Sequence, residues 1–268
     1  MPKYFLLFLA FFLSFSHAFA APYSRPLRGD SYDDIFISTQ NADVTVVSAP
    51  ANGGAIHWRR KYCTVEINKP ADRVYYIDIK PKRQHVFVKW LLGIKVDPCK
   101  IKFEAPGGKN IYISSETGSL KISDVPARNI KLYTAAGSID IDNHSGPISA
   151  ETLTGRITAR NIKSPSVDLK SASGHINASG EAARMSVFNT SGNSRLHGVM
   201  GAVRFYSSEG NLHALWVDLP AAPLEISARS FAGNIEIVLP RHADLAAGKN
   251  NINLKSFYGR TSISKHNN

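Results

Sequence analysis

The chain has 268 residues, of which 43% are apolar and 20% charged, a composition that can bury a sizeable core and that excludes a disordered chain. Its formal net charge is +11. The longest apolar run, residues 4–15, is shorter than the roughly 20 residues that a membrane helix needs, so we expect no retained transmembrane anchor.

The N-terminus has the organisation of a secretory signal peptide. Lys3 gives a basic start, the apolar run follows, and Ala18 and Ala20 stand at the small-residue positions of a cleavage site. We therefore predict a signal peptide over residues 1–20 and a protein exported to the periplasm, the cell surface or the medium. Ala21 follows the site, where a lipoprotein would have cysteine. Residues 21–33 are expected to form a flexible N-terminal segment.

Export makes the two cysteines informative. In an oxidising compartment Cys63 and Cys99 are expected to pair, and closing a loop of this size would stabilise the fold by about 4 kcal/mol. The alternative is two buried free thiols.

Residues 34–109 form a basic, aromatic-rich β region that we expect to begin or cap the following domain. The strands expected here cover residues 34–39, 43–47, 55–60, 74–80, 85–90 and 99–103. Residues 54–109 hold 13 Lys or Arg against 5 Asp or Glu. The clustered cations are Arg59, Arg60, Lys61, Lys80, Lys82, Arg83 and Lys89. They are either a polyanion-binding patch or the water-facing side of a half-buried sheet.

An internal repeat begins after residue 109. Eight glycines mark it, the first six spaced 19, 18, 19, 18 and 18 residues apart and the last two steps lengthened to 23 and 26. These glycines are Gly118, Gly137, Gly155, Gly174, Gly192, Gly210, Gly233 and Gly259. The positions seven and five before each glycine are all apolar, and those two and four after it are apolar except Ser194 and Thr261. A small polar residue stands three before each glycine.

Apolar residues two apart indicate short strands with one buried face, joined by a glycine turn suited to a positive φ. Because such a coil cannot bury its apolar face alone, the fold class predicted for residues 110–265 is an all-β, stacked β-solenoid of about eight coils. An antiparallel meander is the alternative. The insertions at residues 216–223 and 239–251 make that edge the expected place for specific contacts, and residues 266–268 are a tail.

At this point the sequence resembles the bacterial putative-adhesin β-repeat family, a domain of unknown function. The resemblance lies in the opening strand pair at 36–46, the segment 101–106 leading into Thr117–Leu120, the serial Ser/Thr-x-x-Gly-x-Ile turns and a late Val-Leu-Pro at 238–240. It covers residues 34–265. It implies a parallel β-solenoid of the cell envelope, and it transfers no active-site residue.

No catalytic or metal-ligating constellation is recognisable, so no cofactor is expected. His175, His197 and His213 fall in different columns of the repeat, and no paired-ligand spacing occurs. The leading hypothesis is a non-enzymatic, adhesin-like binding or scaffolding module with an envelope glycan, an anionic lipid or a protein as partner. Export disfavours nucleic acid. The alternatives are a glycan-active β-helix enzyme, a polysaccharide lyase or hydrolase, and a scaffold that self-assembles through its solenoid ends.

Overall fold

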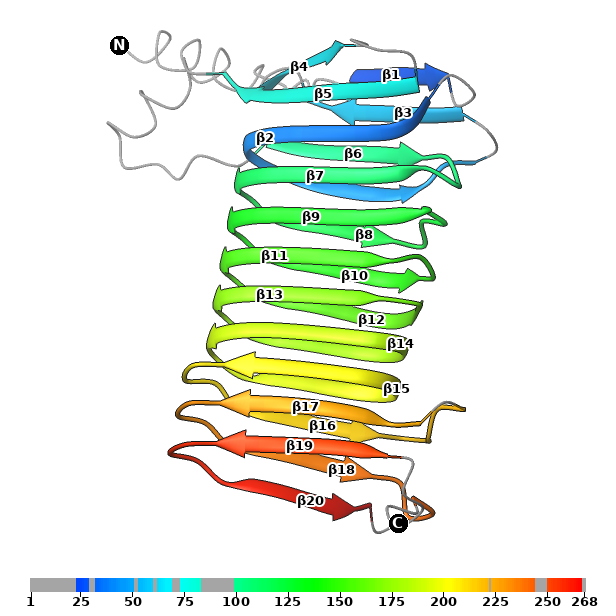
Figure 1. Cartoon of the computed structure of the whole chain (residues 1–268). Coiled ribbons are helices and arrows are strands. Elements are labelled where there is room, and N and C mark those ends of the chain that lie inside the picture. Colours follow the sequence, from blue (N-terminus) through cyan, green and yellow to red (C-terminus); the bar gives the residue numbers. More distant parts are fainter. Residues whose placement is uncertain are drawn as a thin grey trace, which may run out of the picture.

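The computed structural model describes residues 23–28, 32–50, 53–59, 62–68, 73–82, 99–221, 223–243 and 250–266. The predicted signal peptide, the strand expected at 85–90 and residues 267–268 lie outside these ranges. Every regular element in the described part of the chain is a β-strand, and the strands stack into a rod (Figure 1). None of the described residues belongs to a helix that could cross a membrane.

Two ladders of strands run along the rod on opposite sides. The first ladder is, in order, β4 (Cys63–Asn68), β5 (Arg73–Pro81), the first half of β2 (Tyr32–Ser48), β7 (Asn110–Thr117), β9 (Asn129–Ala136), β11 (Ile148–Thr154), β13 (Val167–Ser173), the second halves of β14 (Ile176–Ser191) and β15 (Ser194–Ser207), β17 (Glu225–Ser230) and β19 (Asn251–Ser256).

The second ladder is β1 (Tyr23–Arg28), β3 (Gly53–Trp58), β6 (Cys99–Ala105), the second half of β2, β8 (Leu120–Ser123), β10 (Ile139–His144), β12 (Ile157–Ser164), the first halves of β14 and β15, β16 (Leu212–Trp216), β18 (Ile235–Leu239) and β20 (Thr261–Lys265).

The repeat is a parallel solenoid, and the antiparallel meander is wrong. Ile111 lies opposite Ile130, and Ile130 opposite Ile148, in parallel register. Both corners of each coil turn the chain in the same sense, so it returns to its starting side one strand further on. Equivalent residues of successive coils therefore form columns about 4.8 Å apart.

The region before residue 110 belongs to the same solenoid. β2 forms a coil that pairs with β7 and β8 on one side and with β5 and β6 on the other. Three antiparallel strands, β1, β3 and β4, close this end. Residues 21–33 are therefore not a wholly flexible segment, because Tyr23–Arg28 gain a complete set of partners on β3 and Tyr32 is already a buried residue of β2.

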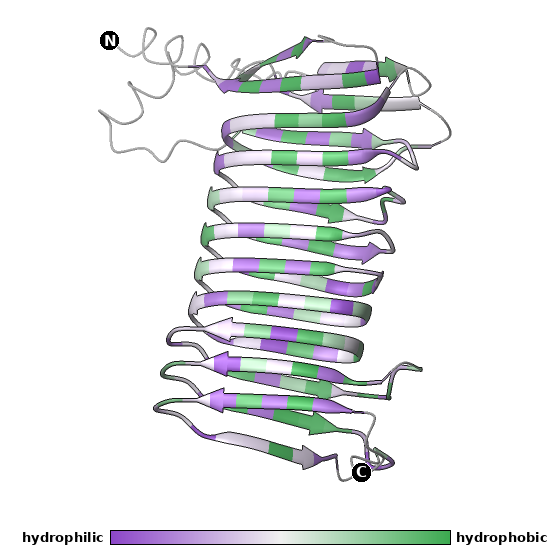
Figure 2. Ribbon diagram, in the orientation of Figure 1, coloured by the Kyte–Doolittle hydropathy of each residue, from purple (hydrophilic) through white to green (hydrophobic). Residues whose placement is uncertain are grey.

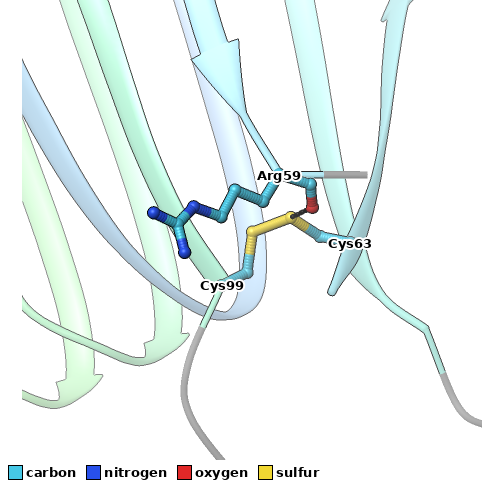
Figure 3. The surroundings of a disulfide bond; sticks show 3 residues. All are labelled: Arg59, Cys63 and Cys99. Atoms are coloured by element: carbon cyan, nitrogen blue, oxygen red, sulfur yellow. Dashed lines mark hydrogen bonds between the residues drawn. A yellow bond between two sulfur atoms is a disulfide. The ribbon is translucent and has the colours of Figure 1, made fainter. Parts of the chain in front are cut away.

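Cys63 and Cys99 form the predicted disulfide (Figure 3). Their Cα atoms are 5.9 Å apart, and the bond joins β4 at the end of the first ladder to β6 of the second. The cross-link therefore joins the two ladders at the end of the rod where strands pair in antiparallel fashion. This end lies before the glycine-marked repeat, so the repeat does not stabilise it.

The core lies between the ladders and consists of the predicted apolar columns, which appear as alternating hydrophobic bands along each strand (Figure 2). Of the two exceptions, Ser194 is buried and its Oγ accepts a hydrogen bond of 3.3 Å from Asn189 Nδ2, which compensates a hydroxyl in the core. Thr261 is exposed because β20 is the last strand of its ladder in the described chain.

The glycine column is required by close approach between coils. A Cβ atom at any of the eight marker glycines would lie between 1.8 and 2.3 Å from the carbonyl oxygen of the equivalent residue one coil before. A positive φ, the reason expected from the sequence, is found at only four of the eight, Gly118, Gly155, Gly174 and Gly192. The lack of space for a Cβ atom is thus the reason for glycine that all eight positions share.

Seven of the eight small polar residues three before the marker glycines make side-chain hydrogen bonds at this corner, the exception being Ser171. Thr134 Oγ1 and Thr152 Oγ1 donate to the carbonyl oxygens of Gly118 and Gly137, at 3.3 and 3.2 Å. Ser256 Oγ donates to Gly233 O at 2.7 Å. Buried hydroxyls thus satisfy carbonyl groups that the sharp turn leaves without ladder partners.

The opposite corner has its own column of left-handed residues, which the sequence analysis did not identify. It consists of Asp124, Asn143, Asn161, Gly180 and Gly198, all with positive φ and each six residues after a marker glycine. Asn143 Nδ2 donates to Asp124 Oδ1, and Asn161 Nδ2 donates to Asp142 Oδ1, at 2.6 and 2.9 Å. Asn, Asp and Gly are the residues that tolerate this conformation.

We expect Gly155→Ala to destabilise the fold by about 3 kcal/mol or more, because its Cβ would overlap the Gly137 carbonyl oxygen and the backbone has a φ of 149°. Gly53→Ala is the matched control, since nothing lies within 4 Å of its Cβ position. Urea unfolding followed by circular dichroism measures both. Equal midpoints for the two variants would contradict the steric account.

His144 makes stability depend on pH. It is 2% exposed, its Nε2 accepts a 3.1 Å hydrogen bond from Gly146 N, and its Nδ1 lies 3.1 Å from Val125 O. This arrangement holds the neutral ring, and burial lowers the pKa of His144 below its ordinary 6.5.

Below about pH 6.5 the unfolded chain therefore binds a proton at His144 that the folded chain does not, so stability falls as the pH is lowered through this range. We expect the melting temperature to drop between about pH 7.5 and pH 5.5 in the wild type and to drop less in His144→Gln. An identical decrease in both proteins would show that the pH dependence comes from other groups.

Candidate functional site

The predicted polyanion-binding patch is only partly within the described chain. Arg60, Lys61, Arg83 and Lys89 lie outside it, as do the aromatic residues Phe87 and Trp90. Arg59 is exposed beside the disulfide, and its carbonyl oxygen lies 3.8 Å from Cys63 Sγ (Figure 3). Lys82 is exposed after β5. The patch as a whole stays a prediction.

Two carboxylates compensate the charge of Lys80. Its Nζ lies 3.0 Å from Asp78 Oδ2 and 3.2 Å from Glu66 Oε2. Hydrogen bonds to Asp78 and then to Glu66 raise the pKa of Lys80 above its ordinary range. A cation held by two carboxylates contributes little to attracting a polyanion.

The two outer faces of the solenoid differ in their side chains. The central outward column of the second ladder is polar or charged throughout, namely His57, Lys102, Thr45, Lys121, Asp140, Thr158, Asn177, Arg195, His213, Glu236 and Ser262. The first ladder and its glycine corner carry most of the large exposed apolar side chains of the described residues, namely Tyr76, Tyr133, Leu153, Phe188, Tyr206, Phe231, Phe257 and Tyr258. We call this side the aromatic face.

Three rings stack at the N-terminal end of the aromatic face. Phe36 lies between Tyr76 and Tyr112, with ring centroids 4.9 and 4.5 Å apart and planes within 11° and 7°. Because these residues are in register on β5, β2 and β7, the spacing of the strands itself sets the stacking distance. Lys131, next in the column, places Nζ 5.6 Å from the Tyr112 ring centroid. We call the three rings the ring column.

A depression of about 570 Å³ lies beside the ring column and crosses β5, β2, β7, β9 and β11. It exists because the neighbouring outward column holds the small Ser38 and Ser114 between the larger Asp78 and Tyr133. The floor is the apolar core, and the polar groups at the rim include Ser38, Ser114, Ser149, Asp78, Glu151 and Lys131. An apolar hollow with a few polar groups is the usual form of a ligand site.

The inserted turns form a smaller and more polar hollow. It measures about 330 Å³ and is lined by His197, Trp216, Arg241, His242 and neighbouring residues. Trp216 is a core residue, since it is 1% exposed and its Nε1 donates to Met200 O at 2.8 Å. His242 pairs with Asp218 at 3.1 Å. This edge was the expected contact region, but within the described residues the larger and more apolar site is on the aromatic face.

The structure separates the three histidines that were weighed as metal ligands. His213 pairs with Glu236 at 2.9 Å, His175 Nδ1 accepts a hydrogen bond from Asn193 N at 3.2 Å, and His197 borders the hollow at the inserted turns. Among the residues with described positions, no group of three or more His, Cys, Asp or Glu could hold a metal ion.

The fold and its surface define a two-sided, parallel β-solenoid with one polar and one aromatic outer face. The chain belongs to the Toastrack DUF4097 family, whose sequence model matches residues 28–179 and 144–268. This confirms the resemblance found in the sequence and the predicted solenoid class.

The chain is also similar, at low identity, to solved structures of proteins described as putative adhesins. A putative adhesin from Parabacteroides merdae is 14% identical, with 92% of this chain and 97% of that chain covered and a TM-score of 0.44. One from Parabacteroides distasonis is 12% identical, with 92% and 98% covered and a TM-score of 0.42. One from Bacteroides fragilis is 10% identical, with 91% and 97% covered and a TM-score of 0.40. A search of curated proteins found no match.

Proposed function

We propose that this chain is a non-enzymatic, exported binding module of the cell envelope, and that it holds a linear glycan in the depression beside the ring column. The observation that carries the proposal is the unequal distribution of aromatic side chains over the two outer faces. A solenoid needs apolar residues only on its inward positions. If exposed rings were needed for stability, both outer faces would need them equally. Their presence on one face therefore indicates a role other than stability.

The chemistry of the depression fits a sugar polymer. Stacking leaves the edges of the three rings outward, and an aromatic edge is the positive part of the ring quadrupole, which favours contact with hydroxyl oxygens. Ser38 and Ser114 donate and accept hydrogen bonds, while the Asp78 and Glu151 carboxylates accept them from sugar hydroxyls. Two carboxylates and one cation, Lys131, give the site no surplus positive charge, which favours a glycan over a strongly acidic polymer.

The shape of the depression fits an extended ligand. It crosses five strands, so a chain of sugars would lie along the solenoid axis and meet a new outward residue about every 4.8 Å. Export is supported by the disulfide, because such bonds persist in oxidising compartments.

We expect Tyr112→Ala to weaken glycan binding at least about tenfold, since a central aromatic anchor contributes about 1.4 kcal/mol or more to such sites. The probes are peptidoglycan fragments and the polysaccharide released from lipopolysaccharide, and the readout is isothermal titration calorimetry. Tyr23→Ala, an exposed aromatic on β1 at the other side, is the control and should bind as the wild type does.

The same samples separate binding from catalysis. Supernatants are assayed for new reducing ends and for unsaturated sugar products. Their appearance would overturn the non-enzymatic proposal, and equal affinities for Tyr112→Ala and the wild type would overturn the site.

A second candidate function is self-assembly through the C-terminal coil. β19 and β20 are the last described strands of the two ladders, and a hollow of about 370 Å³ lined by Ile252, Leu254 and Ile263 opens there. Pro26 on β1 protects the other end, since proline weakens pairing at a strand edge.

If this candidate is correct, the sedimentation coefficient of the wild type rises with concentration, and that of Ile263→Lys does not, because the charge blocks apolar contact at the open coil. A concentration-independent monomer would exclude this function and leave glycan binding untouched.

A further inference from the structure

A cluster of three aromatic side chains projects from the glycine corner of the last two coils. Phe231, Phe257 and Tyr258 are 53%, 66% and 76% exposed, the largest exposed fractions among the aromatic residues of the described chain. Their rings contact one another, with centroids 5.8 Å apart for Phe231 and Phe257 and 5.2 Å apart for Phe231 and Tyr258. The turns that carry them lie at the left edge of the rod in Figure 1.

The cluster is not needed for the fold. Most other coils turn at the same corner with a small or polar residue two before the marker glycine, such as Ser208 one coil and Thr190 two coils before Phe231. Leu153 is the exception in an earlier coil, and no aromatic ring stands at this position before Phe231. Three rings that leave more than half of their surface in water cost free energy unless another surface covers them.

One cation lies against the cluster, and two more belong to the strand and the turn that carry it. Lys255 Nζ lies 5.2 Å from the Phe257 ring centroid, Arg229 precedes Lys255 in the same outward column, and Arg260 follows Gly259 in the turn. Over residues 202–210, 225–234 and 251–260 there are four cations and two acids. One of the acids, Glu225, begins β17 at the far end of the strand, so Glu209 is the acid of the corner itself.

We propose that this corner patch, formed by Phe231, Phe257, Tyr258, Arg229, Lys255 and Arg260, docks the solenoid on a membrane surface that contains anionic lipid. Aromatic rings favour the boundary between lipid headgroups and acyl chains, and Lys or Arg beside them are attracted to anionic headgroups. The patch is convex, and a deformable bilayer can cover a projecting cluster, whereas a rigid ligand needs a hollow.

The surplus of cations argues against a second copy as the occupant, because two identical patches facing each other would bring like charges together. The patch lies on the same side of the solenoid as the ring column but four or more coils away from it. Docking is therefore independent of the proposed glycan site.

The test is co-sedimentation of the mature chain with vesicles of phosphatidylcholine alone and of phosphatidylcholine with phosphatidylglycerol, at low and high salt. We expect salt-sensitive binding to the anionic vesicles only. Lys255→Ala/Arg260→Ala should weaken it roughly thirtyfold, from about fivefold for each cation near a membrane surface. Phe257→Ser/Tyr258→Ser should reduce it at least about tenfold while leaving the melting temperature unchanged, because both side chains are exposed.

Val217→Ser, an exposed apolar side chain at the opposite corner, is the matched control and should bind vesicles as the wild type does. The proposal would be overturned by equal binding to neutral vesicles or by no binding at all. It would also be overturned if the protein sediments without vesicles and the aromatic variant does not, because a second copy would then be the occupant. The glycan affinity of the aromatic variant is measured in parallel and stays at the wild-type value if both proposals hold. A failure of membrane docking can therefore be distinguished from a failure of glycan binding.

Discussion

The close approach of successive coils at the glycine corner is the constraint on which the rest of this structure depends. A marker glycine lies so near the carbonyl group of the coil before it that not even a Cβ atom fits between them. This contact holds successive coils in parallel register, and the register aligns the inward and outward positions of neighbouring coils into columns. The buried Ser and Thr side chains then satisfy the carbonyl groups that the turn leaves unpaired.

The same register creates the surfaces on which function is proposed. In a parallel ladder, neighbours in a column are separated by one strand spacing, which is also a good distance for stacked aromatic rings. The rings of Phe36 and Tyr112 therefore stack without further adjustment. Where small residues replace large ones in the next column, a hollow forms that a long ligand can follow from coil to coil. The sites proposed for this rod therefore lie along its side and at its last described coil.

The two ends of the rod are built differently, and this matters for any role in an envelope. The N-terminal end is closed by antiparallel pairings and a disulfide, and β4, the edge strand of the first ladder, runs against the direction of the repeat. The last described coil keeps the parallel direction and exposes part of its apolar interior. A molecule with one closed and one open end, and with one aromatic and one polar face, can present its surfaces in a defined orientation.

Much of the fold was determined by the sequence itself, because each coil repeats the same local rule. Period-two apolar positions, the glycine and the small polar residue three before it predicted the solenoid and its buried columns without any long-range information. The second corner could also have been found, since Asp, Asn or Gly recurs six residues after the first five marker glycines. So could the outward column of Tyr133, Phe188 and Tyr206, four before each of their glycines.

Only the tertiary structure decided the strand direction, the cap and the site. A repeat of 18 or 19 residues fits a meander as well as a coil, because the period does not record whether the chain returns on the same side. The ring column joins Phe36, Tyr76 and Tyr112 from three strands whose order in the sheet differs from their order in the chain. Its residues follow no common sequence spacing. β5 and β6 pair with β2 from far along the chain, and only this long-range pairing brings the rings together.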